Sequence, residues 1–308
     1  RRAAPCPPAV VYRWGAERGR PSSEVPEVLR DRRGRLWGGT ARGLCLFDAA
    51  HGCSAVYGEE QGLPGSYVLD LFEAKTGDLW VGLLGGASRL RFDDARAGAP
   101  EVSTLRVADG LPAEQVQAIA EDEHGTIWLA GSGGLAAFRE TTADAARRVR
   151  AWTAAQGLPS GSLYGLLAGS DGEMWIGAAG SGLLRFRPPA DPLAPSAPPL
   201  AFTHFGREQG IDARAVFAVR EDGRGRLWLT TNAGIYHFDP RAHGGRGAVL
   251  RHFDRSSGLI SNDVSTGNSI ALDDQGRVWA GFSGGTTCFD PALEEAPLPP
   301  PPTSIDRV

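Results

Sequence analysis

The chain has 308 residues, of which 42% are hydrophobic and 22% are charged, so it can bury a large core and is unlike a disordered segment. Its formal net charge is −4, and its charges are mixed without a basic stripe, which argues against a nucleic-acid partner. No apolar run approaches the roughly 18 residues that cross a bilayer, so membrane contact is expected only through flanking segments. The 42 glycines and 22 prolines favour short strands joined by turns over helices.

The dominant feature of the sequence is a tryptophan that recurs every 43 to 53 residues, with a glycine three residues before each copy. The copy at residues 172–177 reads GEMWIG. A residue that keeps one offset in every copy is typical of a structural core rather than of a platform for ligand stacking. The repeated residues are Trp37, Trp80, Trp128, Trp175, Trp228 and Trp279.

Each tryptophan lies within a predicted unit of four strands. An apolar first strand, such as residues 67–72, precedes the glycine turn, and the tryptophan occupies the second strand. The third strand ends in phenylalanine, and the fourth leads into the next unit through a segment such as Gly-Leu-Pro at residues 62–64. Two residues after the tryptophan the side chain is always small, which suits the narrow part of a wedge of packed sheets. These small residues are Gly39, Gly82, Ala130, Gly177, Thr230 and Gly281.

The two ends of the chain complement each other. The chain begins with a fourth strand at residues 10–14, and its last unit ends after a third strand at Phe289. Residues 9–15 are therefore predicted to complete the last blade and to close the ring. The pattern predicts an all-β fold over residues 1–297, a β-propeller of six four-stranded antiparallel blades. A ring of seven blades is the alternative.

Two proline-rich segments depart from the period. Residues 187–200 contain six prolines and lengthen the loop between the third and fourth strands of the fourth blade. This insert is predicted to be an exposed, partly extended excursion. The tail that begins at residue 298 is predicted to be a stiff linker.

The four cysteines allow one short disulfide. Cys45 and Cys53 fall on adjacent strands of a predicted hairpin, where a bond between them is geometrically allowed, and two separate thiols are the alternative. A disulfide would favour an oxidising compartment. The cysteines form no CxxC pair and do not cluster with histidine, so no metal and no cofactor is expected.

The repeated unit resembles the two-component regulator propeller repeat. The shared features are Gly-Leu-Pro, an apolar strand, Asp-x-x-Gly-x-Leu-Trp-x-Gly-Thr, Gly-Leu and Phe-Asp, and they cover nearly the whole chain. The unit from residue 258 to the proline-rich tail is similar to the blade that precedes a small β-sandwich in this family. The resemblance implies that residues 298–308 are a linker and the start of that sandwich.

The same resemblance implies a function in signal transduction. Such a propeller is the extracytoplasmic or periplasmic sensor of a membrane-anchored hybrid histidine kinase or diguanylate cyclase, whose output lies in other domains. The chain is therefore expected to bind a ligand rather than to catalyse a reaction, and the full-length protein is expected to be able to form a homodimer. Members of the family usually have seven-bladed rings, which is the basis of the seven-blade alternative.

A propeller binds ligands at the mouth of its channel, which is framed by the loops into the first strands and by the loops between the second and third strands. The aromatic, amide and charged side chains predicted there suit a small polar or sugar-like ligand or a protein partner. For each of them a solvated loop position is the alternative. The predicted set is Arg42, Tyr67, Gln115, Tyr164, Arg214, Asn232, Asn262 and Asp263.

Two other classes of function compete with sensing. The first is an enzyme resembling the streptogramin lyases, which are also propellers and need a histidine base and a metal-assisting carboxylate at the channel mouth. The predicted strands place no histidine there, so no catalytic residue is assigned. The second is a protein-interaction scaffold without a small ligand.

Overall fold

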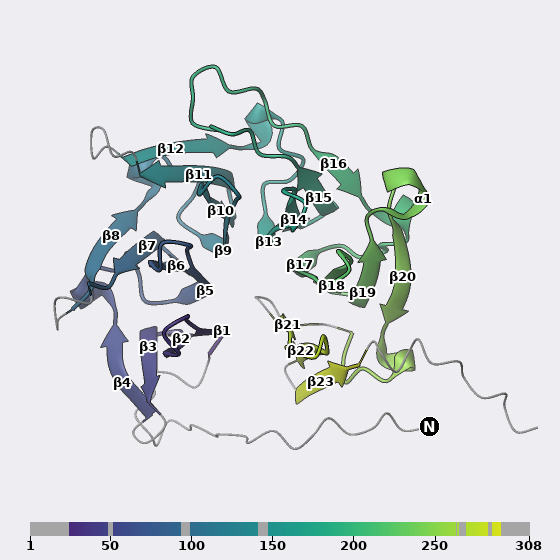
Figure 1. Ribbon diagram of the computed structural model, residues 1–308, viewed down its shortest axis with the longest axis horizontal. Helices are drawn as coiled ribbons and strands as arrows, with labels where there is room; N and C mark the ends of the chain where they lie inside the picture. The colour runs from purple at the N-terminus through teal and green to yellow at the C-terminus, as the bar shows by residue number, and fades with distance from the viewer. Residues whose placement is uncertain are drawn as a thin grey trace, which may run out of the picture.

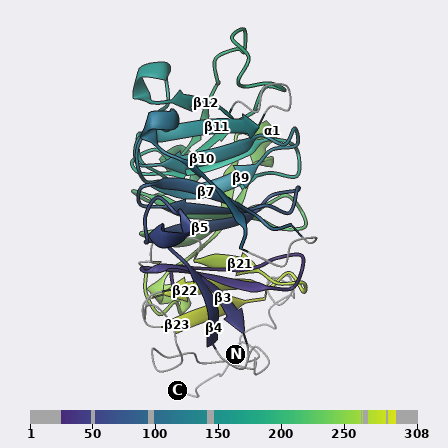
Figure 2. The same cartoon turned by 90° about the vertical axis from the view of Figure 1, so that its left-hand side faces the viewer.

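The computed structural model describes residues 25–48, 52–93, 99–140, 147–262, 264, 269–282 and 285–290, which form six antiparallel sheets arranged in a ring (Figure 1). Five sheets have four strands, and the sixth has three within the described residues. The strands of each sheet follow one another in chain order from the inside of the ring outwards. The last blade lies beside the first in two perpendicular views (Figures 1 and 2). The six-bladed β-propeller is confirmed, and the seven-bladed alternative is not adopted.

The first three blades run from β1 to β12. The first contains β1 (Glu27–Arg30), β2 (Leu36–Thr40), β3 (Gly43–Asp48) and β4 (Gly52–Tyr57). The second contains β5 (Val68–Glu73), β6 (Leu79–Leu83), β7 (Gly86–Arg91) and β8 (Glu101–Leu105). The third contains β9 (Val116–Glu121), β10 (Ile127–Gly131), β11 (Gly134–Glu140) and β12 (Arg147–Trp152).

The other three blades run from β13 to β23. The fourth contains β13 (Leu163–Ala168), β14 (Met174–Ala178), β15 (Gly182–Phe186) and β16 (Thr203–Phe205). The fifth contains β17 (Val216–Glu221), β18 (Leu227–Thr231), β19 (Gly234–Asp239) and β20 (Ala248–Phe253), with the short helical turn α1 (Ala242–Gly245) before β20. The sixth contains β21 (Ile270–Leu272), β22 (Val278–Phe282) and β23 (Gly285–Phe289).

The links between blades are built on one local pattern. A short 3₁₀ helix ends at a glycine in the left-handed region, where a side chain would be strained, as at Gly62 with φ 94°. The next residue, Leu63, is 2% exposed and packs into the core between the first two blades. The 3₁₀ helices are η2 (Glu59–Gln61), η3 (Val107–Asp109), η4 (Ala154–Gln156), η5 (Arg207–Gln209) and η6 (Arg255–Ser257).

An aspartate six residues before the tryptophan closes the turn between the first and second strands in four blades, and in three of them it also binds the indole. One oxygen of Asp122 accepts the backbone N–H of Thr126 at 2.9 Å, and the other accepts the indole N–H of Trp128 at 2.8 Å. Asp31 and Asp273 make the same pair of bonds in the first and last blades. The indole bond from Trp279 lowers the pKa of Asp273 to about 2. These carboxylates therefore orient the indole as well as the turn.

The fifth blade replaces this indole bond with a buried histidine. Asp222 lies 3.2 Å from Nε2 of His237, and the imidazole stacks on Trp228 with ring centroids 4.2 Å apart. His237 is 6% exposed. Burial lowers the pKa of His237 below its usual 6.5, and the hydrogen bond to Asp222 opposes this effect only in part. The imidazole is therefore neutral in the folded protein at neutral pH.

The buried His237 predicts a loss of stability in mild acid. Because its pKa is lower in the folded than in the unfolded chain, the unfolded chain binds more protons once the pH falls below about 6.5. The free energy of unfolding should therefore decrease from about pH 6.5 downwards until the folded pKa is passed. Melting temperatures measured between pH 7.5 and 5 should show this slope in the wild type, and His237→Gln should flatten it.

The control for this pH dependence is His124→Gln, which changes an exposed histidine in a turn and should keep the wild-type slope. The carboxylates of Asp31 and Asp273, whose pKa values are lowered, change the free energy of unfolding only below about pH 4, outside the pH range of this measurement. An unchanged slope in His237→Gln would contradict the assignment.

The hydrophobic core lies in layers between neighbouring blades. Each cluster of buried apolar residues joins two consecutive blades, from the first and second to the fifth and sixth. At four junctions the indole of one blade meets a phenylalanine in or just after the third strand of the next. These pairs are Trp37 with Phe92, Trp80 with Phe138, Trp128 with Phe186 and Trp228 with Phe289, with ring centroids 5.0 to 6.3 Å apart. The repeated aromatic residues are thus the contacts that hold the ring.

The insert at residues 187–200 lies where the sequence predicts, between β15 and β16, but it is not simply exposed. The guanidinium of Arg150 on β12 donates to the carbonyl oxygen of Pro192 at 3.0 Å, and Arg139 on β11 donates to that of Ala190 at 3.1 Å. Leu193 packs against the core between the third and fourth blades. The prediction of an exposed excursion was wrong in this respect, because arginines of the preceding blade satisfy the backbone of the insert.

The structure places a disulfide between Cys45 on β3 and Cys53 on β4, with their Cα atoms 5.7 Å apart. It closes the hairpin of the two outer strands of the first blade, and Cys45 is fully buried. Cys288 on β23 is disulfide-bonded as well.

Removing the Cys45–Cys53 disulfide with the double substitution Cys45→Ala and Cys53→Ala is expected to lower the free energy of unfolding by about 2–3 kcal/mol. The bond closes a loop of only eight residues' separation, so the entropy it removes from the unfolded chain is modest. Denaturant titrations of the wild type and the variant, each with and without reductant, measure the loss. A wild type that is insensitive to reductant would contradict the prediction.

Residues 9–15 and 298–308, to which the sequence analysis assigned the closing strand and the linker, lie outside the described residues. Among the described residues, no helix is long and apolar enough to span a membrane.

Candidate functional site

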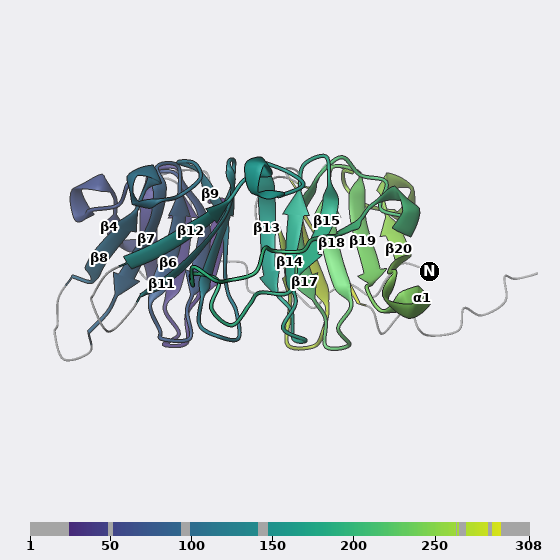
Figure 3. The ribbon, with the colours of Figure 1, turned by 90° about the horizontal axis from the view of Figure 1, so that it is seen from above.

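Two different sets of turns form the two faces of the ring (Figure 3). On one face, which we call the mouth face, the loops into the first strands meet the loops between the second and third strands of the preceding blade. Leu84 pairs there with Gln115, Ser132 with Ser162 and Ala179 with Ala215. The other face, which we call the turn face, contains the turns between the first and second strands at residues 31–35, 74–78, 122–126, 169–173, 222–226 and 273–277.

The predicted site residues lie on the mouth face at different depths. Tyr67 and Gln115 immediately precede the first strands of their blades. Tyr164 lies two residues deeper than the equivalent Ser162, at a β-bulge, and its ring contacts Phe217 edge to face with centroids 5.4 Å apart. Tyr67 and Tyr164 therefore do not occupy equivalent positions, because Tyr67 precedes its strand whereas Tyr164 is the bulge residue, as Leu69 is in the second blade.

Two of the predicted amides accept hydrogen bonds from nearby loop backbone. Oδ1 of Asn232 accepts the backbone N–H groups of Arg214 and Ala215 at 2.9 and 3.0 Å, and Oδ1 of Asn262 accepts that of Arg255 at 2.7 Å. Arg42, Arg214 and Asn232 are exposed. The prediction at Asp263 lies outside the described residues. The mouth-face set is thus a ring of loop positions, and its role in binding stays a prediction.

A central cavity of about 870 Å³ lies between the first strands of all six blades. In the third, fourth and fifth blades only the second half of the first strand lines it, so the cavity lies towards the turn face. None of the predicted mouth-face residues that the structure describes is part of its lining. The walls are mainly apolar, and their charged side chains are Glu27, Asp70, Glu121 and Arg220.

The charged side chains of the cavity are held by defined contacts. Asp70 on β5 is 2% exposed and accepts the backbone N–H of Ile119 on β9 at 2.6 Å. Glu121 accepts the backbone N–H of Lys75 at 2.6 Å, and Nη1 of Arg220 donates to the carbonyl oxygen of Val219 at 2.9 Å. Apart from Arg220, the contacts reach from one blade to the next.

These residues were not among the predicted site residues, although the repeat contains a signal for them. Glu27 and Asp70 stand opposite Gly39 and Gly82, at the position where the next three blades have Ala118, Gly165 and Ala218. Arg220 stands opposite Trp228, where the first four blades have Leu29, Phe72, Ala120 and Leu167. Charged residues that break the repeat on the innermost strand would have pointed to the cavity.

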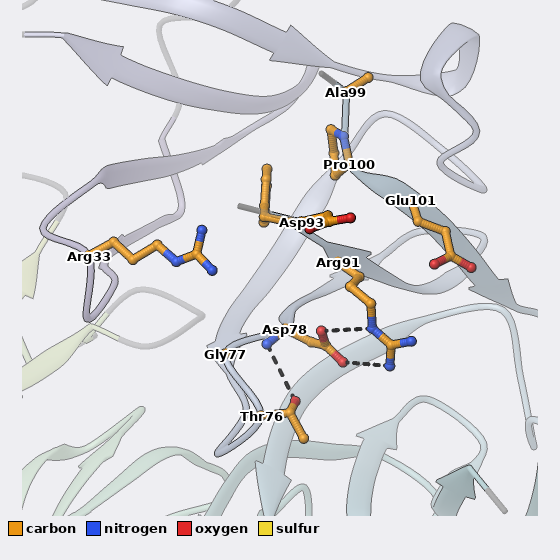
Figure 4. Close-up of a pocket in the computed structure, with 10 residues that line it drawn as sticks. Arg33, Thr76, Gly77, Asp78, Arg91, Asp93, Ala99, Pro100 and Glu101 are labelled. Carbon is orange, nitrogen blue, oxygen red and sulfur yellow. Dashed lines mark hydrogen bonds and ion pairs between the residues drawn. The ribbon is translucent and has the colours of Figure 1, made fainter. Parts of the chain in front are cut away.

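A second cavity, of about 770 Å³, lies on the turn face beside the second blade (Figure 4). Arg91 and Asp78 form a two-bond ion pair in it at 3.3 Å, with Arg33 reaching in from the turn of the first blade (Figure 4). Glu140 of the third blade binds both Arg89 and Arg91. The hydrogen bond to Asp78 raises the pKa of Arg91, and that to Arg89 lowers the pKa of Glu140. This network joins the second and third blades. In the second blade, Ala74 takes the place of the turn aspartate.

No catalytic constellation is found among the described residues. No three His, Cys, Asp or Glu side chains in that part of the chain are grouped so as to hold a metal ion. The described histidines lie in turns, on the third strand of the fifth blade or on outer strands, and none of them lines the central cavity. They are His124, His204, His237, His243 and His252.

Residues 110–133 match the family described as two component regulator propeller. The match spans the loop into the third blade, β9, the turn and β10, which includes the Asp122–Trp128 pair. No curated protein matches the chain in sequence.

Several solved propellers share the fold. The extracellular domain of a protein from B. thetaiotaomicron assigned to a hybrid two component system is 23% identical with a TM-score of 0.56, and the match covers 88% of this chain and 39% of that one. PorZ, a surface component of the type-IX secretion system of Porphyromonas gingivalis, is 17% identical with a TM-score of 0.63, covering 86% and 38%. A catalytically inactive virginiamycin B lyase from Staphylococcus aureus, solved with quinupristin, is 14% identical with a TM-score of 0.61, covering 87% and 80%.

The chain thus spans 39% and 38% of the lengths of the first two of these proteins. Sequence identities this low show only that the fold is shared. The resemblance inferred from the repeats is confirmed by the family match in the third blade. The chain is a six-bladed β-propeller that carries a two component regulator propeller repeat.

Proposed function

We propose that this propeller is the extracytoplasmic ligand-sensing domain of a membrane-anchored bacterial signalling protein. In this proposal a small polar or sugar-like ligand, or a protein partner, binds at an end of the central channel. The chain itself is non-catalytic, and other domains of the protein carry the signalling output. A homodimer of the full-length protein belongs to the same proposal.

The observation that carries the proposal is the contrast between a repeated scaffold and a varied channel. The tryptophans, turn glycines and interblade phenylalanines recur from blade to blade. The lining of the central cavity, in contrast, differs from blade to blade, since Glu27, Asp70 and Arg220 stand where other blades have small or apolar residues. A pocket with apolar walls and a few placed polar groups is the usual form of a small-molecule site.

Two further observations support an extracytoplasmic location. Cys45, Cys53 and Cys288 are all disulfide-bonded, and disulfides persist mainly in oxidising compartments. The match to a domain described as extracellular, from a hybrid two component system, points the same way.

Thermal-shift screening against sugars, amino acids and aromatic acids, with and without divalent metal, tests the proposal. A sensing domain should be stabilised by a ligand that is recovered unchanged, because ligand binding to the folded state raises the melting temperature. Tyr164→Ala and Arg214→Ala then report whether the mouth face contributes to binding.

Two outcomes favour the competing functions. Metal-dependent turnover of a lactone substrate would contradict the sensing proposal in favour of a lyase. Stabilisation by no compound of the panel, combined with specific capture of a protein through the mouth face, would favour an interaction scaffold.

A further inference from the structure

The central cavity has charge of opposite sign on opposite sides. Glu27 and Asp70 lie at one register position on β1 and β5, which are in contact with each other. Arg220 lies on β17, and in the order of the ring the fifth blade faces the second across the channel (Figure 1). All three side chains line the cavity. Glu121 of the third blade also lines the cavity, so the negative side spans the first three blades and Arg220 of the fifth blade gives the positive side.

Neither side of this dipole is needed for the repeat. Other blades place alanine or glycine where Asp70 stands, and alanine, leucine or phenylalanine where Arg220 stands. Because a charge inside a protein costs free energy unless an opposite charge or hydrogen bonds compensate it, charges that the scaffold does not require indicate a functional use. Asp70 is 2% exposed and Glu27 is 9% exposed, so both carboxylates are largely removed from water, and the N–H of Ile119 offsets part of that cost at Asp70.

The walls between the two charged sides are apolar. Leu29, Phe72 and Leu167 line the cavity at the position that Arg220 occupies in the fifth blade. Apolar walls exclude water, which strengthens ion pairs formed by a ligand inside the cavity. A volume of about 870 Å³ is within the usual range for a small-molecule site.

We propose that the cavity binds a small zwitterion with an apolar body, such as a hydrophobic amino acid. The ammonium group of the ligand lies on the side of Asp70 and Glu27, its carboxylate pairs with the guanidinium of Arg220, and its apolar part contacts Phe72 and Leu167. This assignment rests on the proposed sensing function, and it places the ligand towards the turn face rather than at the predicted mouth-face residues.

Calorimetric titration of the whole chain with phenylalanine and two blocked derivatives tests the assignment. N-acetylphenylalanine has no ammonium group, and phenylalanine amide has no carboxylate. Each should bind the wild type about tenfold more weakly than phenylalanine or worse, because each loses a charge-assisted hydrogen bond.

Two cavity variants make the test specific to each charge. Asp70→Asn keeps an oxygen that can accept the N–H of Ile119, so the fold is retained while the charge is removed. It should weaken phenylalanine and phenylalanine amide about tenfold and leave N-acetylphenylalanine unchanged. Arg220→Gln should weaken phenylalanine and N-acetylphenylalanine by a similar factor and leave phenylalanine amide unchanged.

The matched control is Arg251→Ala, which removes an exposed arginine from the outer strand of the fifth blade, away from the cavity, and should leave all three affinities unchanged. Loss of binding in Arg251→Ala, or equal weakening of all three ligands by both cavity variants, would overturn the assignment. Binding of a neutral sugar that is insensitive to Asp70→Asn and Arg220→Gln would also overturn it while leaving the sensing function in place. If no compound of the wider panel binds the wild type, the sensing function itself is contradicted.

Discussion

Replacing Trp128 with alanine is expected to lower the free energy of unfolding by about 3–5 kcal/mol. The indole is fully buried between the third and fourth blades, where it contacts Trp152 at 5.4 Å and Phe186 at 5.0 Å between ring centroids. The substitution leaves a cavity between two blades and removes the indole partner of Asp122, which would then be left in a buried position. Denaturant titration followed by circular dichroism measures the loss.

The control for Trp128 is the equivalent residue of the last blade. Trp279 makes the same bond to Asp273 at 2.9 Å but is only half-buried. Since less apolar surface is returned to water, Trp279→Ala should cost clearly less than Trp128→Ala. Equal losses at the two positions would show that the interblade layer does not set the contribution of the tryptophan.

Replacing Gly177 with alanine is expected to destabilise the ring by about 1–3 kcal/mol, although it adds a single methyl group. A Cβ atom at this position would lie 2.5 Å from the carbonyl oxygen of Val216, which belongs to the first strand of the next blade. That oxygen is part of the backbone, so β14 and β17 would have to move apart. The melting temperature of Gly177→Ala against the wild type measures the effect.

Gly281→Ala is the matched control for this substitution. Gly281 holds the same place after its tryptophan in the sixth blade, but the nearest described atom to an added Cβ is the carbonyl oxygen of Ser269 at 3.8 Å. This distance is ordinary van der Waals contact, so the substitution should be nearly neutral. A loss as large as that of Gly177→Ala would contradict the argument from blade spacing.

The small residue after each tryptophan shows how far local sequence reasoning reaches. The pattern correctly indicates close packing at Gly39, Gly82 and Gly177, where an added Cβ would meet the next blade at 2.5 to 2.7 Å. It does not tell these positions from Ala130 and Thr230, which occupy the same place in the third and fifth blades. The permitted size depends on the distance to the neighbouring first strand, and that distance is a property of the assembled ring.

The candidate site could be predicted only in part. The mouth-face loops were placed correctly because the turn glycines and the strand order decide on which face a loop lies. The depth of Tyr164 was not predicted, because it depends on a β-bulge between Leu163 and Gly165. The central cavity was missed because its charged residues lie inside predicted strands, where the repeat assigns them to packing.

The sequence by itself determined the six blades, their strand order, the turns and the aromatic residues between blades, because each follows from local rules of turn chemistry and from a repeat of about 50 residues. Only the tertiary structure decided that Asp122 and its counterparts hold the indoles and that the proline-rich insert packs on the preceding blade. It also decided that Asp70 and Arg220 face one another across a single cavity. The insert contacts and the cavity join residues of different blades, and the spacing between such residues is set when the sheets pack into a ring.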